Sequence, residues 1–123
     1  MLTHINTISV QVSDQDKALD FYVNKLGMEK IQDSPMSEEE RWLTVAPPGS
    51  QPEIVLTTQD IGGMSGFKGL IFGTEDIAAT VEELEARGVN ITVPLSVEFW
   101  GKWVQFADPD GNEFGIWAPP DEM

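Results

Sequence analysis

Two stretches that repeat one another decide the fold: "DQDKALDFYVNKLG" at residues 14–27 and "EDIAATVEELEARG" at residues 75–88. An offset of 61 residues aligns them and places Gly27 on Gly88. The same offset places "RWLTVAPPG" at residues 41–49 on "KWVQFADPDG" at residues 102–111, so that Trp42 matches Trp103. A fixed offset across a helix and a hairpin indicates two copies of one supersecondary unit.

Each copy predicts the element order βαβββ. In the first copy, residues 5–12 alternate between polar and apolar side chains, as a half-buried strand does. Asp14 can cap the helix that follows, and Gly27 can end it. We expect a strand at residues 28–32 and a hairpin of residues 41–46 and 53–58. The second copy predicts a strand at 68–74, a helix at 76–87, and strands at 89–93, 102–107 and 113–118.

The sequence therefore predicts an α+β fold of two tandem βαβββ modules, with the helices on one face of each sheet. Module 1 spans residues 1–59, a glycine-rich linker spans residues 59–67, and module 2 spans residues 68–119. A chain of 123 residues is short for two independent domains, so we expect a single domain over residues 1–123.

Composition narrows the classes of function. The chain has no cysteine, which excludes disulfides, cysteine-bound zinc and thiol nucleophiles. It has 7 basic and 21 acidic residues, and a net charge of −14 argues against a nucleic-acid partner. That charge serves solubility or favours a cationic ligand. We find no apolar run of membrane-spanning length and no signal peptide, so we expect a cytoplasmic protein with no membrane partner.

Histidine is also scarce. The only one, His4, stands near the start of the first predicted strand, where we expect a surface residue. One histidine allows no site of two histidines and one carboxylate within a chain, and no Ser-His-Asp site without His4. Most metal chemistry on ordinary protein ligands is therefore disfavoured.

Strand alternation places a distinctive set of side chains on the face away from the helices. The set combines aromatic walls, small residues that leave space, and neutral polar groups, which is the usual composition of a small-molecule pocket. A subunit interface or the seam between the modules is the alternative use of the tryptophans. The predicted ligand-binding residues are Thr7, Ser9, Gln11, Trp42, Val55, Gly69, Trp100, Trp103, Gln105, Glu113, Gly115 and Trp117.

The stretches "ISVQVSDQDKALDFYVNKLGM", "LEARGV" and "WVQFADPDGNEFGI" together resemble the vicinal oxygen chelate superfamily. This superfamily includes glyoxalase I, extradiol dioxygenases and bleomycin-resistance proteins. The resemblance implies paired βαβββ modules that form a cup-shaped mixed sheet, usually in a homodimer. Metal-dependent members carry one metal ligand on each of four strands, and those positions correspond here to Thr7, Val55, Gly69 and Gly115. Valine and glycine offer no donor atom, so the resemblance implies no metal and no cofactor.

What remains resembles the metal-free, bleomycin-resistance-like branch, whose members bind planar cationic drugs in an acidic, aromatic-lined groove. We therefore expect a metal-independent protein that binds an aromatic compound, cationic or neutral, such as an antibiotic or a toxic metabolite. An enzyme of the same superfamily, a lyase, isomerase or dioxygenase with an atypical or absent metal site, stays open, with Glu53 and Glu113 as candidate acid–base groups. A non-catalytic subunit whose tryptophans line a dimer interface also stays open.

Overall fold

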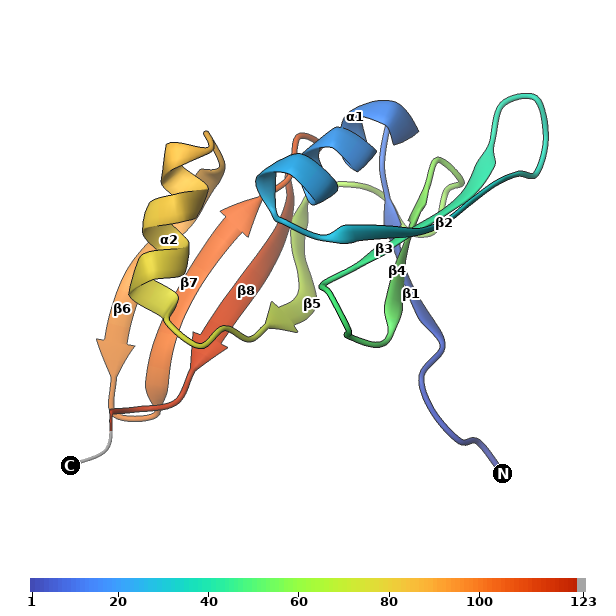
Figure 1. Ribbon diagram of the computed structural model, residues 1–123. Helices are drawn as coiled ribbons and strands as arrows, with labels where there is room; N and C mark the ends of the chain where they lie inside the picture. The colour runs from blue at the N-terminus through green and yellow to red at the C-terminus, as the bar shows by residue number, and fades with distance from the viewer. Residues whose placement is uncertain (122–123) are drawn as a thin grey trace. The chain divides into compact units, whose positions relative to one another are not determined.

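The computed structural model describes residues 1–121 and divides into two compact units, Met1–Met64 and a second that begins at Ser65 (Figure 1). Each unit has one four-stranded sheet and the element order βαβββ. The predicted α+β fold of two tandem βαβββ modules is thus confirmed. Among residues 1–121, no helix combines the length and the apolar composition that crossing a membrane requires.

The first unit begins with β1 (Thr7–Gln11) and α1 (Gln15–Asp20), which continues as a wider π-helical turn, η1 (Phe21–Lys25). Three strands follow: β2 (Glu29–Pro35), β3 (Arg41–Ala46) and β4 (Glu53–Thr57). The sheet has the order β1-β4-β3-β2, in which β1 runs parallel to β4 and the other pairs are antiparallel. Helix α1 lies over one face of this sheet (Figure 1).

The second unit repeats this plan with β5 (Gly66–Phe72), α2 (Ile77–Ala86), β6 (Asn90–Glu98), β7 (Gly101–Ala107) and β8 (Asn112–Ala118). Its sheet has the order β5-β8-β7-β6, again with one parallel pair, β5 with β8. The two edge positions filled by β2 and β6 therefore correspond, as the repeat in the sequence predicts.

The helix ends follow the local signals in the sequence. The Asp14 carboxylate accepts a hydrogen bond from the Lys17 backbone N–H at 3.1 Å, and Asp76 accepts one from Ala79 at 3.1 Å. Such N-caps satisfy backbone donors that have no partner within the helix. Gly27 then adopts a φ of +76°, a left-handed conformation that glycine reaches at little cost.

The edge strands differ from the prediction in length. β2 extends to Pro35 and β6 to Glu98, three and five residues beyond the predicted ends at 32 and 93. The β6–β7 register shifts between Val93 and Ser96, on either side of Pro94. Proline has no backbone N–H to donate to a neighbouring strand, and an edge strand tolerates this because only one of its sides has a partner strand. The first strand of the second unit also differs from the predicted range of 68–74, since β5 spans Gly66–Phe72 and brings Phe67 into the sheet.

The core of each unit lies between its helix and its sheet. In the second unit, Phe106 and Phe114 are almost fully buried, with ring centroids 5.7 Å apart, and Phe72 packs 6.0 Å from Phe114. Burying an aromatic side chain of this size contributes about 1.5–3 kcal/mol. In the first unit the corresponding side chains are aliphatic, and they are Val10, Val12, Leu43, Val45, Ile54 and Leu56.

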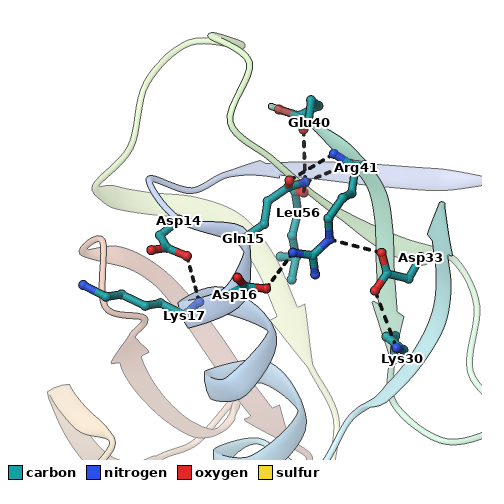
Figure 2. A network of polar contacts seen from close by, with 9 residues as sticks. All are labelled: Asp14, Gln15, Asp16, Lys17, Lys30, Asp33, Glu40, Arg41 and Leu56. Carbon is teal, nitrogen blue, oxygen red and sulfur yellow. Dashed lines mark hydrogen bonds and ion pairs between the residues drawn. The ribbon is translucent and has the colours of Figure 1, made fainter. Parts of the chain in front are cut away.

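A polar network ties the start of α1 to β3 and β4. Figure 2 shows the Gln15 amide between Arg41 and Leu56: its Nε2 donates to both carbonyl oxygens at 2.8 Å, and its Oε1 accepts from the Arg41 N–H at 3.1 Å. The Arg41 guanidinium bonds Asp16 at 2.6 Å and Asp33 at 3.1 Å. The hydrogen bond to Asp16, then that to Asp33, raises the pKa of Arg41 above its ordinary value. These polar groups therefore stabilise the contact between the start of α1 and the sheet.

Candidate functional site

The β7–β8 hairpin presents one face of mixed aromatic and small residues. Trp103 pairs with Trp117 across the two strands, Gln105 with Gly115, and Ala107 with Glu113. The residues between them, including Phe106 and Phe114, are buried on the α2 side of the sheet. Five of the predicted ligand-binding residues therefore share the face away from α2: Trp103, Gln105, Glu113, Gly115 and Trp117.

A hollow of about 540 Å³ lies on this face, lined by Ile71, Trp100, Trp103 and Trp117. Trp100 comes from the turn between β6 and β7, and Ile71 from β5. The lining side chains are large and apolar, yet Ile71 keeps 54% of its surface exposed, Trp100 46% and Trp117 40%. Large exposed apolar groups gathered in one place mark a surface that binds something.

Trp103 is held by its neighbours rather than left free to rotate. Its indole Nε1 donates a hydrogen bond to Gln105 Oε1 at 3.0 Å. The Phe67 ring meets it edge-on, with ring centroids 6.1 Å apart and an interplanar angle of 63°. An aromatic pair of this geometry contributes about 0.5–1.5 kcal/mol beyond its buried area.

Phe67 is a residue of this face that the sequence reasoning missed. The sequence predicts that it lies in the linker, but in β5 it pairs with Glu113 of β8, and Ile71 pairs with Gly115. The signal was present in the alternation, since Phe67, Gly69 and Ile71 stand at every second position. Gly69 itself has a φ of +73° at the point where the β5–β8 register shifts, so its backbone forms an irregularity in the strand.

The corresponding face of the first unit is polar. Thr7 pairs with Glu53 and Ser9 with Val55 between β1 and β4, and Trp42 of β3 pairs with Ser34 of β2. Val55 keeps only 4% of its surface exposed. The Gln11 side-chain oxygen accepts hydrogen bonds from the backbone N–H groups of residues 61 and 63 at 3.0 and 2.9 Å, so this predicted site residue holds a loop.

Glu53 is fixed on the same polar face. Its Oε1 accepts a hydrogen bond from the Thr44 hydroxyl at 2.6 Å and another from Gln32 Nε2 at 2.8 Å. These bonds, that of Thr44 first, lower the pKa of Glu53 below its ordinary value of 4.5 because they stabilise the charged carboxylate. Glu53 is therefore an anion at neutral pH.

Residues 4–116 match the Glyoxalase/Bleomycin resistance protein/Dioxygenase superfamily. This chain belongs to that superfamily. A superfamily member from Sphaerobacter thermophilus DSM 20745 is 37% identical, with 94% of this chain and 97% of that one aligned at a TM-score of 0.86. TnmS3, an antibiotic binding protein from Streptomyces sp. CB03234, is also 37% identical, with 96% and 97% aligned at a TM-score of 0.84.

The relatives of this chain also include an enzyme. Lactoylglutathione lyase GLX1 of Arabidopsis thaliana is 31% identical over 117 residues. The match covers 86% of this chain and 41% of the lyase, so this chain spans less than half of that enzyme's length.

The superfamily's four metal-ligand positions fit a metal ion poorly in this chain. Thr7 offers a hydroxyl, Val55 a buried isopropyl group, and Gly69 and Gly115 no side chain at all. Divalent ions are held by imidazole, carboxylate or thiolate groups, and these positions supply none of them. Within residues 1–121, no three His, Cys, Asp or Glu side chains gather closely enough to hold an ion. His4 is exposed, and its ring bonds only the neighbouring Thr3 hydroxyl among the contacts seen, at 2.9 Å.

Proposed function

We propose that this protein is a metal-independent binding protein for a small aromatic compound, which it binds on the tryptophan face of the second unit. The observation that carries the proposal is the hollow lined by Trp100, Trp103, Trp117 and Ile71. Its volume falls within the roughly 300–1,000 Å³ usual for small-molecule sites. Stacking against indole rings favours flat aromatic groups over aliphatic ones.

The charge of the chain favours a cationic member of that class. At a net charge of −14, the protein attracts cations and repels anions. Glu113 stands on the same face as the tryptophans, opposite Phe67. A cation over an indole ring gains about 0.5–2 kcal/mol more. The similarity to TnmS3, an antibiotic binding protein, supports sequestration of an antibiotic or toxic metabolite as the biological role, and we place this role in the cytoplasm.

Fluorescence titration with proflavine, a flat tricyclic cation, tests the proposal. We expect saturable quenching of tryptophan fluorescence, and isothermal titration calorimetry should give the same Kd. The variants Trp103→Ala and Trp117→Ala should each weaken binding several-fold, because each removes one stacking surface. Binding that survives both substitutions with the same Kd would show that the hollow is not the site.

A homodimer is part of the same proposal. Its support on this chain is the tip of the β6–β7 hairpin, where Val97 and Phe99 keep 71% and 92% of their surfaces exposed. Light scattering coupled to size-exclusion chromatography should give twice the monomer mass of 13.6 kDa. If the tryptophans lined the dimer interface instead of a ligand site, iodide would fail to quench their fluorescence in the dimer.

The alternative function is a lyase, which the 31% identity to lactoylglutathione lyase GLX1 favours. General-base catalysis needs a group that titrates near the working pH. Because its pKa is lowered, Glu53 titrates further from neutral pH and is poorly suited to be the general base. Metal analysis of protein purified without chelator, together with an assay for lactoylglutathione turnover, separates the two functions. A stoichiometric divalent ion with turnover that EDTA abolishes would establish the lyase.

A further inference from the structure

Trp103 and Trp117 pair across the hairpin, and their rings extend in opposite directions along it. A methyl group at residue 115 would meet Cη2, Cζ2 and Cζ3 of Trp103 at 2.3, 2.7 and 2.9 Å, so the indole occupies the place where a side chain would begin. A methyl group at residue 101 would meet Nε1 of Trp117 at 2.4 Å. Each ring thus extends to the diagonal neighbour on the facing strand, and each of those neighbours is a glycine.

Gly115 has no backbone reason to be glycine. Its φ lies outside the left-handed region, and the atoms that a side chain would meet are those of the Trp103 ring. Gly101 differs, because its φ is +140° and an added methyl group would also approach the Ala118 carbonyl oxygen at 2.6 Å. Seating the indole therefore accounts for glycine at 115, whereas at 101 the backbone also requires it.

Gln105 fixes the ring from the same end of the hairpin. It pairs with Gly115 across the strands, and its Oε1 accepts the hydrogen bond from Trp103 Nε1. This bond, together with the space that the missing side chain leaves at residue 115, holds the Trp103 ring beside Gly115. The Trp117 ring lies beside Gly101 instead, so the two rings are held apart. The hollow is lined by these two separated rings.

We propose that Gly115, with Gln105, positions Trp103 apart from Trp117, so that the hollow accepts a flat fused-ring aromatic ligand in preference to a compact or non-planar one. This inference rests on the proposed function and names its ligand class and its positioning residues. Pre-organised rings bind a flat ligand without the entropic cost of ordering them, so the selectivity is set in the free protein.

The test compares Gly115→Ala with Gly73→Ala. Gly73 is the matched control because an added methyl group there meets nothing within 4 Å and its φ lies outside the left-handed region. We expect the near-ultraviolet circular dichroism of the free Gly115→Ala protein to change as Trp103 moves. Its Kd for proflavine and for acridone, the neutral flat tricycle, should rise roughly three- to tenfold. Dicyclohexylamine, a non-planar cation, should bind weakly and equally to all three proteins.

Three outcomes contradict the proposals in distinguishable ways. If wild type binds neither proflavine nor acridone, the proposed function fails and this inference fails with it. If wild type binds them and Gly115→Ala retains the same Kd, this inference alone fails. A Kd for dicyclohexylamine as low as that for proflavine also overturns the selectivity for flat ligands.

Gln105→Leu is the second variant, and it is used if Gly115→Ala does not fold. It removes the acceptor of the Trp103 N–H, whereas Gln105→Glu keeps an acceptor at that place. We expect Gln105→Leu to change the near-ultraviolet spectrum and raise the proflavine Kd several-fold, and Gln105→Glu to restore both. An unchanged spectrum in Gln105→Leu would show that the ring needs no such positioning.

Discussion

The two units of this protein share one topology and present different chemistry on corresponding faces. In the first, Glu53 accepts hydrogen bonds from Thr44 and Gln32 and pairs with Thr7 on the neighbouring strand. In the second, the face carries tryptophans and leaves an apolar hollow. The fold therefore does not determine the face: a few positions on the strands do, and they have diverged while the strand pairing was kept.

Val55 and Gly115 show how little has to change. Val55 pairs with Thr44 in the first unit as Gly115 pairs with Gln105 in the second. At 55 the isopropyl group fills its own place and is buried, whereas at 115 the bare backbone leaves that place to the Trp103 ring. At this one of the differing positions, the presence or absence of a side chain decides whether an indole can lie there.

The largest expected effect separates the two faces of β8. Phe114→Ala should lower the free energy of unfolding by about 3–5 kcal/mol, because Phe114 is fully buried against Phe106 and Phe72 and its removal leaves a cavity. Trp117→Ala, on the other face of the same strand, should lower it by about 1 kcal/mol or less. Urea unfolding followed by far-ultraviolet circular dichroism measures both. Equal losses would show that the tryptophan face is part of the core.

The next effect separates the tryptophans of the two units. The double variant Trp103→Ala/Trp117→Ala should weaken proflavine binding about ten- to a hundredfold, since two stacking surfaces are lost. Trp42→Ala should cause a smaller loss, because Trp42 pairs with Ser34 and does not line the hollow. Calorimetry gives the three affinities. A loss in Trp42→Ala as large as in the double variant would remove the asymmetry between the units.

The elements were predictable wherever local chemistry sets them. The residues that begin and end the helices, Asp14, Asp76 and Gly27, lie next to those helices in the sequence. Both ends of β3 were predicted to the residue. The ends of β2 and β6 were not, because an edge strand continues for as long as its neighbour offers backbone partners. That depends on pairing between distant residues, which one sequence does not show.

The candidate site was predictable to the level of faces and not beyond. Period-two alternation placed Trp103, Gly115 and Trp117 together, and the cross-strand register agrees. Phe67 was missed because its place depends on the parallel β5–β8 register. The direction in which each indole extends depends on rotamers that packing selects. The sequence alone therefore does not predict that the rings lie against Gly101 and Gly115.

A smaller effect distinguishes the charge of the whole chain from the rings of the second unit. Raising the salt concentration from about 0.05 M to 0.5 M should weaken proflavine binding a few-fold, because salt screens the attraction between the cation and a chain of net charge −14. Acridone is neutral and has the same ring system, so its Kd should hardly change. Titrations of both compounds at each salt concentration provide the comparison. Equal salt dependence would show that the charge of the ligand contributes nothing.

The smallest effect lies in the polar face of the first unit. In Thr44→Val, Glu53 loses the stronger of its two hydrogen bonds, so its pKa should rise toward the ordinary value of 4.5, as carboxyl carbon NMR shifts measured against pH would show. Thr44→Ser keeps the hydroxyl and should keep the low pKa. Because the folded pKa is depressed, this carboxylate stabilises the wild type fully above pH 4.5, and the stabilisation disappears as pH falls through the folded pKa. The difference in stability between Thr44→Ser and Thr44→Val should therefore shrink over that acidic range. A stability difference that stays constant with pH would mean that Thr44 acts through packing alone. The charge of Glu53 would then contribute nothing to the stability of the polar face.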